Sequence, residues 1–433
     1  MAEDMIRFGK STIYQISLRV FTPEGTIRAA QKLLEHVQRL GPKYIQLNPV
    51  ALADDDMDQT YWSKRQKASR TGNPKNTYRI RDYFAVDDEY GTEEDLQAFV
   101  AEAHARGLKV IFDLVYYHCG PRAVFLEEHP DFVLRNEDGS FKLGGWAFPV
   151  FNFENPAVRE YLWRNMVWYV ERFDADGFRC DVGDMVPMDF WAEGARRVRA
   201  IKPGFLMLNE GSRHGEAFDV CYFYDGFNEL PAAARGETTA AAFMDKWEMA
   251  RAARPAGKHI LHMIDNHDIC SDGGEARHEK TVGTAAVDAM LVTMFMLDGV
   301  PFVFNGYEAA DDLKHNMFAS RFFKPDPAIN WANMLTEKGR RRFELLRQLF
   351  ALRNSSDDLA SADLIRLPGG SENVIAFVRP GRESHVAVVN LSAAPVSVAL
   401  EGVPAAQPVL ENGAERGEGA VSLAGWGYYV GKF

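Results

Sequence analysis

The stretch "TEEDLQAFVAEAHARGLKVIFDLV", residues 92–115, joins a helix pattern directly to a strand pattern. Thr92 and Asp95 have the spacing of a capping box, in which two side chains satisfy the free N–H groups at the start of a helix. Apolar residues at positions 96, 99, 100 and 103 share one face of that helix, and Gly107 is typical of a helix end. The run "KVIFDLV" that follows is mostly apolar, as in strands covered on both faces. This stretch predicts an α/β protein with a parallel sheet.

Eight apolar runs of this kind occur along the chain, and helical patterns separate them. Asn155 and Pro156, for example, stand where the cap and the first turn of another helix are expected. Eight strands alternating with helices predict a (β/α)8 TIM barrel, although an open doubly wound sheet would have the same strand number. The predicted strands are residues 12–17, 44–47, 109–115, 177–181, 206–210, 220–224, 260–264 and 301–305.

Two connections are long, and the tail of the chain changes character. Residues 48–91 follow the second predicted strand, and residues 116–154 follow the third and form a short insertion with a hairpin signal at 135–145. After residue 354, short alternating runs with Gly, Pro and Asn between them predict an antiparallel β-sandwich. The expected domains are residues 1–354, including the inserted subdomain 116–154, and residues 355–433.

The composition limits the classes of partner. The chain has 433 residues and a formal net charge of −12, which argues against a nucleic-acid partner because phosphates attract basic surfaces. Its longest apolar stretch, residues 289–297, is too short to span a bilayer, and its first residues lack the pattern of a signal peptide. The four scattered cysteines are expected to be free thiols in a reducing compartment. We therefore expect a cytoplasmic protein that binds neither nucleic acid nor membranes.

Polar side chains gather at the ends of the predicted strands. In "DGFRCDVGD", residues 176–184, Arg179 and Asp181 lie two positions apart and so share one face of a strand. The pair alone could be a structural ion pair. In a barrel, however, the carboxyl ends of all strands meet at one mouth, so that other strand-end residues would join them there. Those residues are Asp113, His118, Glu210, Asn266, His267, Asp268 and Glu308.

Two kinds of chemistry suit such an array of carboxylates. Metal-assisted hydrolysis would use aspartate and histidine ligands, but no clustered histidines lie on one strand. Glycoside hydrolysis needs one ionised carboxylate as nucleophile and one protonated carboxyl as acid. Arg179 beside Asp181 would keep that carboxylate ionised, and the apolar neighbours of Glu210 would raise its pKa. The sequence has no G-x-S-x-G motif, P-loop or G-x-G-x-x-G after a strand.

These residues carry a resemblance to the α-amylase family, glycoside hydrolase family 13, that covers nearly the whole chain. "YGTEEDLQAFVAEAHARGLKVIFDLVYYH" resembles its third unit with the D-x-x-x-N-H motif, "DGFRCDVGD" its G-F-R-x-D motif, and "LNEG" its acid-bearing strand. "DNHD" matches its N-H-D motif and "LDGVPFVFNGYE" its G-x-P-x-x-Y-x-G-x-E segment. The motifs occur in the family's order. The resemblance implies a catalytic TIM barrel with a small insertion after strand three and a C-terminal β-sandwich.

The resemblance also implies a role for individual residues. Asp181 would be the nucleophile, Glu210 the general acid/base and Asp268 the stabiliser of the transition state. Arg179 would orient Asp181, and Tyr78 would stack under the sugar. His118 and His267 would bind sugar hydroxyls. The implied activity is that of a retaining α-glycosidase acting on α-1,4-linked glucosides such as maltodextrins, without a cofactor.

The chain departs from the family pattern at several positions. Tyr117 replaces the Asn of D-x-x-x-N-H, which in much of the family binds calcium, so that we expect no metal requirement. Asp184 and Met185 replace a basic pair after the nucleophile, and Asp272 stands near the place of an Arg after N-H-D. Transfer of glucosyl units, as in a transglycosidase or a sugar isomerase, and a non-catalytic sugar-binding role are the alternatives. Linkage preference, endo or exo action and oligomeric state are open.

Overall fold

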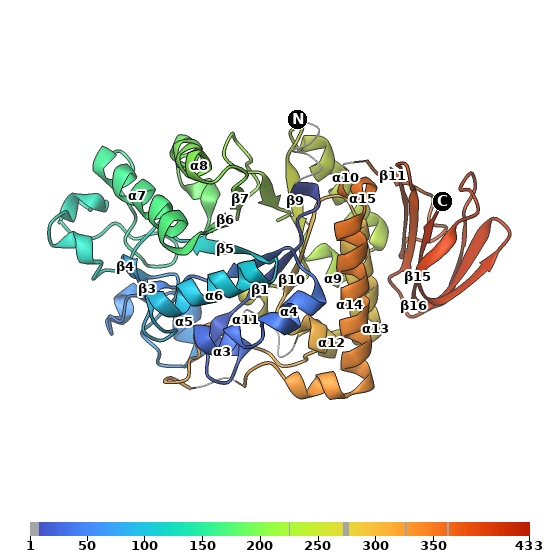
Figure 1. Cartoon of the computed structure of the whole chain (residues 1–433), viewed down its shortest axis with the longest axis horizontal. Helices are drawn as coiled ribbons and strands as arrows, with labels where there is room; N and C mark the ends of the chain where they lie inside the picture. The colour runs from blue at the N-terminus through green and yellow to red at the C-terminus, as the bar shows by residue number, and fades with distance from the viewer. Residues whose placement is uncertain (1–7, 225, 272–276, 325–326, 362) are drawn as a thin grey trace.

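A closed barrel of eight parallel strands is the centre of the molecule (Figure 1). The computed structural model describes residues 8–224, 226–271, 277–324, 327–361 and 363–433. Around the barrel the strand order is β1-β10-β9-β8-β7-β6-β5-β2, so the predicted TIM barrel is confirmed and the open sheet is excluded. Each strand overlaps one of the eight predicted runs. The barrel strands are β1 Ile13–Ile16, β2 Tyr44–Leu47, β5 Lys109–Leu114, β6 Gly177–Cys180, β7 Leu206–Asn209, β8 Val220–Tyr222, β9 His259–His262 and β10 Val300–Phe304.

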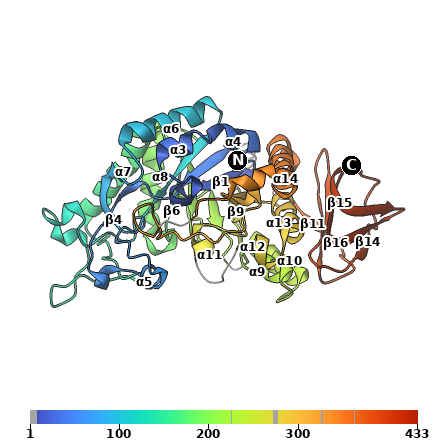
Figure 2. The ribbon, with the colours of Figure 1, turned by 90° about the horizontal axis from the view of Figure 1, so that it is seen from below.

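Helices surround the barrel, and the predicted caps begin two of them (Figure 2). In α6, Thr92 and Asp95 form the capping box, and in α7, Asn155 caps the helix before Pro156. None of the helices within the described ranges is both long and apolar enough to cross a bilayer. The helices are α2 Leu18–Phe21, α3 Ile27–Gln31, α4 Leu34–Leu40, α5 Lys64–Ser69, α6 Glu93–Ala105, α7 Pro156–Phe173, α8 Met188–Ile201, α9 Glu229–Ala234, α10 Ala240–Ala253, α11 His267–Ser271, α12 His278–Thr281, α13 Thr284–Met296, α14 Glu337–Ser355 and α15 Asp357–Ala360.

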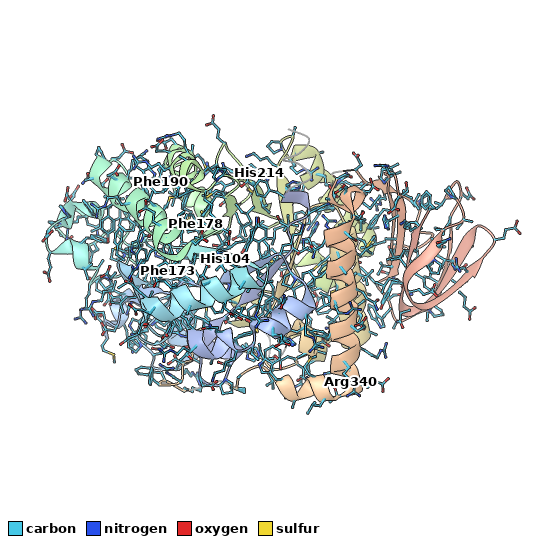
Figure 3. All side chains as sticks on the ribbon, in the orientation of Figure 1. His104, Phe173, Phe178, Phe190, His214 and Arg340 are labelled. Atoms are coloured by element: carbon cyan, nitrogen blue, oxygen red, sulfur yellow. The ribbon has the colours of Figure 1, made fainter. Side chains whose placement is uncertain are left out.

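The alternation of side chains along β6 decides which residues face the barrel interior. Phe178 (labelled in Figure 3) packs outward against Tyr169 of α7 and against Phe205. The ring-centroid distances are 6.0 and 4.7 Å. Arg179, the next residue, is fully buried on the opposite side of the strand and contacts Asp113 of the neighbouring strand β5. Apolar packing on one side of β6 therefore fixes the guanidinium inside the barrel.

The long connection after β2 contains elements that the sequence patterns did not predict. β3 Ala51–Ala53 and β4 Ile80–Val86 form an antiparallel pair with register shifts, and α5 lies between them. The later connection, residues 116–154, contains the expected hairpin region, where Arg135 bridges Phe141 and Leu143 bridges Pro149. The shifts in β3 and β4 break the two-residue alternation, which explains why neither strand was recognised.

The C-terminal strands form one antiparallel sheet, which lies beside α13 and α14 and also contacts α10 (Figure 1). One face, with Ile375 and Phe377, belongs to the main core, and the other, with Val374 and Ala376, has a smaller core of its own. The edge strand β15 was not predicted, because two bulges interrupt a largely exposed, polar sequence. The predicted division of the chain after residue 354 stays a prediction. The strands are β11 Ile365–Arg366, β12 Val374–Arg379, β13 His385–Asn390, β14 Val396–Ala399, β15 Gln407–Gly417 and β16 Ala420–Lys432.

Candidate active site

A cavity of about 710 Å³ opens where the carboxyl ends of the barrel strands meet. The loops that follow β2, β5, β6, β7, β8, β9 and β10 all contribute side chains to its lining. Two of the predicted site residues, Arg179 and His267, lie buried directly behind this lining. The other predicted residues line the cavity itself, namely Tyr78, His118, Asp181, Glu210 and Asp268.

Arg179 is the centre of the deepest part of this site. Its Nη1 atom donates to Asp113 Oδ1 at 2.7 Å and to Asp181 Oδ1 at 2.8 Å. Its Nη2 atom lies 2.6 Å from Glu210 Oε2, an ion pair whose angles are not those of a hydrogen bond. The sequence placed Arg179 and Asp181 on one face, and the structure adds two further carboxylates to the same guanidinium.

One guanidinium does not balance three buried carboxylates, and the pKa values reflect this. Burial, opposed by Arg179, raises the pKa of Asp181 to about 7, and the negative charge of Asp113 adds to the rise. Burial likewise raises the pKa of Asp113 to about 7 and that of Glu210 to about 8. Burial raises the pKa of all three carboxyls, which favours a retained proton within the cluster. That Arg179 keeps Asp181 ionised stays a prediction.

Asp268 has the opposite electrostatic environment. Its pKa is lowered to about 2, because His267, Arg65 and Arg179 outweigh the cost of burial. Arg65 Nη1 donates to Asp268 Oδ1 at 2.7 Å, and Arg65 Nη2 donates to the Asp268 backbone carbonyl at 3.2 Å. Asp268 is therefore a fixed negative charge on the cavity wall at every pH at which the protein is expected to work.

A chain of hydrogen bonds connects the two parts of the site. The Tyr78 hydroxyl donates to Asp113 Oδ2 at 2.9 Å and lies 2.6 Å from His267 Nε2. The His267 ring stacks on the Tyr78 ring at 5.3 Å, and its Nδ1 atom lies 2.9 Å from Gln15 Nε2. Because the Gln15 amide nitrogen can only donate, Nδ1 accepts and Nε2 carries the proton. Burial lowers the pKa of His267 to about 4, so the ring is neutral at pH 7.

His118 lies on the side of the cavity formed by the insertion after β5. Its ring contacts Phe148 at 4.8 Å and Trp146 at 5.6 Å. Burial lowers the pKa of His118 to about 3, and its Nδ1 atom is buried without a hydrogen-bond partner among the described residues. A neutral imidazole with an unused polar atom at the cavity wall is suited to binding a hydroxyl group.

Sequence patterns missed Arg65 and did not recognise the part that Asp113 plays in the cluster. Arg65 belongs to α5 in the connection after β2 and is 203 residues from its partner Asp268, so no local motif connects them. Asp113 was noted at the end of its strand, and its contact with Arg179 follows from the register of β5 and β6, in which the two residues are direct partners. A correct prediction of the register between β5 and β6 would have placed Asp113 beside Arg179.

One strand-end residue, Glu308, did not join the site as expected. Glu308 is fully buried, accepts hydrogen bonds from the Tyr14 hydroxyl and the Gly306 N–H, and does not line the cavity. The expectation that it faces the mouth is wrong, because the turn after β10 directs it toward Tyr14. Asp272 lies outside the described residues.

The residues near Tyr117 do not fit the calcium site of much of the family. The Tyr117 ring packs edge-on against Trp146 at 6.2 Å, and its phenol is a poor ligand for a hard cation. Within the described ranges no group of three or more His, Cys, Asp or Glu side chains could hold a metal ion.

Comparisons with known proteins agree with this geometry. The family profile described as "Alpha amylase, catalytic domain" matches residues 7–140. The α-amylase MalA of Haloarcula japonica is 27% identical over 90% of this chain, and neopullulanase 2 of Thermoactinomyces vulgaris is 28% identical over 72% of it. In both cases the match covers 56% of the relative, so the chain spans about half the length of these curated relatives.

A solved structure has the same fold over nearly its full length. The maltogenic α-amylase AmyB of Thermotoga neapolitana superimposes with a TM-score of 0.82 at 23% identity, covering 98% of this chain and 99% of the other. The profile match over residues 7–140 and the similarity to α-amylase MalA over 90% of the chain point to the α-amylase family.

Proposed function

We propose that this chain is a retaining α-glycosidase that hydrolyses α-1,4-glucosidic bonds in maltodextrins or maltooligosaccharides. The observation that carries the proposal is that Asp181 and Glu210, from the ends of adjacent strands, contact the same buried guanidinium. Two carboxyl groups held close together in different protonation states suit a retaining mechanism. Relatives named α-amylase, neopullulanase and cyclomaltodextrinase support the substrate class.

In the first step, the ionised Asp181 carboxylate attacks the anomeric carbon of the bound glucosyl unit. The bond from that carbon to the glycosidic oxygen breaks as Glu210 gives its proton to the leaving oxygen, and a covalent glycosyl ester forms on Asp181. Protonation of Glu210 removes one negative charge beside Arg179, which leaves the guanidinium to Asp113 and Asp181. The same event therefore prepares the acid and favours the ionised nucleophile.

In the second step, Glu210, now ionised, takes a proton from a water molecule. The water oxygen forms a bond to the anomeric carbon, and the ester bond to Asp181 breaks. Two inversions at one carbon leave the product in the α configuration. Asp268, ionised by its contacts with Arg65 and His267, stabilises the positive charge that develops on the sugar ring in both steps.

The cavity wall supplies the binding surface for a neutral sugar. Tyr78 lies at the deepest part, between Asp113 and His267, and would stack under the glucosyl ring. His118 offers a neutral imidazole to a sugar hydroxyl, whereas both ring nitrogens of His267 are engaged by Gln15 and Tyr78. Further aromatic side chains extend the lining on both sides and provide apolar faces for neighbouring glucose units. They are Trp146, Phe148, Tyr222, Tyr224 and Phe227.

Two alternatives share some of these features. A transglycosidase or sugar isomerase would pass the glucosyl unit from Asp181 to another sugar instead of to water. A non-catalytic sugar-binding relative would need none of the three carboxylates, all of which this chain retains. A cytoplasmic location is part of the proposal, supported by relatives named intracellular maltogenic amylase in Bacillus subtilis and by four cysteines that are free and buried.

The test is incubation with maltoheptaose, with chromatography of the products over time and proton NMR of the first product. Shorter maltooligosaccharides that appear first as α anomers are expected. Products longer than the substrate would favour transfer, and a β anomer formed first would exclude Asp181 as nucleophile. The Asp181→Asn variant is the blank for contaminating amylase.

A further inference from the structure

Asp184 stands where much of the family has a basic residue just after the nucleophile, and its position in the structure is unlike that of a residue that contacts substrate. It follows β6 in a short turn, η4 Gly183–Met185. The cavity lining includes Val182, but among the described residues neither Asp184 nor Met185 contributes to it. Neither side chain is therefore placed to contact a substrate in this cavity.

The Asp184 carboxylate is bound by the loop that follows Glu210. It accepts hydrogen bonds from Asn209 Nδ2 at 2.8 Å, from the Ser212 N–H at 2.9 Å and from the Arg213 N–H at 3.2 Å. The Ser212 hydroxyl adds a longer contact at 3.3 Å. These donors lie on both sides of Glu210 in the sequence, so Asp184 holds the backbone before and after the proposed acid.

The two loops also fit closely against each other. A Cβ atom on Gly211 would lie 2.4 Å from Asp184 Oδ1, and one on Gly183 would lie 2.2 Å from Asn209 Oδ1. Both distances are far below van der Waals contact. The glycines therefore permit an approach that any larger residue would push apart.

The turn after β6 also donates a hydrogen bond to Glu210 itself. The Val182 N–H donates to Glu210 Oε2 at 2.8 Å, the oxygen that also lies beside Arg179 Nη2. Val182 has φ +38° and ψ +44°, left-handed values that are costly for a β-branched residue. The packing of the two loops maintains this conformation, which aims the Val182 N–H at Glu210.

We propose that Asp184 is a positioning residue for Glu210. It fixes the loop that carries the acid, and through the strained turn at Val182 it keeps one Glu210 oxygen in place so that the other can reach the glycosidic oxygen. The inference rests on the proposed function. Substitution of a residue with this role should lower kcat/KM strongly for a substrate whose leaving group must be protonated. It should lower kcat/KM little for a substrate whose leaving group needs no proton.

The test compares two substrates in the wild type and in Asp184→Asn. Maltoheptaose has a sugar leaving group that requires protonation, whereas α-maltosyl fluoride releases fluoride without it. The value kcat/KM reports only the steps up to formation of the glycosyl ester, so the later role of Glu210 as a base does not affect it. For Asp184→Asn we expect kcat/KM on maltoheptaose to fall about 30- to 100-fold, in the range caused by misplacing a catalytic group, and on the fluoride less than about threefold.

Two further variants keep the result interpretable. Gly211→Ala retains Asp184 but forces the same contact apart, and it should show the same selective loss. Asp189→Asn is the matched control, because Asp189 is an exposed aspartate on α8 that pairs with Arg159 and does not contact the Glu210 loop. It should leave both substrates unchanged.

Equal losses on the two substrates in Asp184→Asn and Gly211→Ala would assign Asp184 a purely structural role and overturn the proposal, as would full activity in both variants. Failure of the wild type to cleave either substrate would instead contradict the proposed function.

Discussion

The two arginine–carboxylate groups of this site differ in the number of carboxylates that each arginine serves. Arg179 is fully buried and contacts Asp113, Asp181 and Glu210, and the pKa of each of these carboxyls is raised. Arg65 is partly exposed and pairs with Asp268, whose pKa is lowered. An ion pair with arginine therefore does not by itself make a carboxylate a strong acid. The number of negative charges around the guanidinium and the depth of burial decide the direction.

Because of this difference, the two groups are suited to different tasks in catalysis. The Arg179 cluster stores a proton and can move it, because its members titrate near neutral pH as a coupled group. The Asp268 carboxylate, paired with Arg65, stays ionised between pH 4 and pH 9. A glycosidase needs both, since one carboxyl must give up a proton and another must remain negative while the sugar becomes positive.

The largest effect is expected from removing the reacting groups of the Arg179 cluster. Asp181→Asn removes the proposed nucleophile, and Glu210→Gln removes the proposed proton donor, so each should lower kcat/KM on maltoheptaose by about 10³-fold or more. Thermal unfolding of both variants checks that the fold is retained. Activity within tenfold of the wild type in either variant would remove that residue from the mechanism.

The next largest effect is expected for Arg179→Lys. A lysine keeps one positive charge but cannot contact three carboxylates from a planar fork, so that two of them lose their partner. We expect kcat on maltoheptaose to fall about 10²-fold. A parallel measurement on Arg197→Lys, an exposed pair with Glu160 on the outer helices, should show no change. Comparable losses of kcat in both variants would mean that the contacts of Arg179 with the three carboxylates are not the cause of the loss.

A smaller effect is expected for Arg65→Met, which tests the other half of the comparison. Without Arg65 the pKa of Asp268 should rise and its side chain should lose its fixed orientation, so kcat should fall about tenfold with little change in KM. Lys67→Met removes a cation from the same helix without a contact to Asp268 among the hydrogen bonds of the described residues, and it should retain full activity. If KM alone rises in Arg65→Met, the arginine binds substrate instead of supporting Asp268.

These two groups also differ in how far the sequence could predict them. Arg179, Asp181 and Glu210 were placed together because they end consecutive barrel strands, and strands with continuous apolar sequence are recognisable one by one. Arg65 was not found, because it comes from α5 in an irregular connection whose position depends on tertiary contacts. The sequence also did not predict that three carboxylates contact Arg179. These contacts depend on distances across the barrel interior, and the alternation of side chains along one strand gives no information about such distances.

The fold shows the same limit. All eight barrel strands and the caps of α6 and α7 follow from local patterns, whereas β3, β4 and β15 contain bulges that cancel the alternation. Glu308 was misplaced for a related reason. A position beyond the end of a strand was assumed to face the mouth, but the turn after β10 directs the side chain toward Tyr14.

The pH profile of kcat/KM tests whether the negative charge of Asp113 raises the pKa of Asp181 in the Arg179 cluster. In the wild type, kcat/KM should follow a bell whose two limbs lie above the ordinary carboxyl range, because burial raises the pKa of both Asp181 and Glu210. Asp113→Asn removes a negative charge that raises the pKa of Asp181, so the acid limb should move to lower pH by about half a unit to one unit. Measurement from pH 4 to pH 9 checks this. A limb that does not move would mean that Asp113 is already neutral when Asp181 titrates.

The smallest expected effect is that of removing metal ions. Dialysis against EDTA should change neither Tm nor kcat by more than about 1 °C or twofold, because the position of the family's calcium-binding asparagine holds Tyr117, whose ring is packed on Trp146. The charged groups of the site have protein partners of their own, with Arg179 and Arg65 in the places where a cation would otherwise balance the carboxylates. Magnesium added after EDTA treatment is the matched control for a general effect of salt. A large loss of turnover that calcium restores and magnesium does not would show that carbonyl or carboxylate oxygens elsewhere in the chain form a calcium site, and that the arginines do not suffice to hold the cavity in its active form.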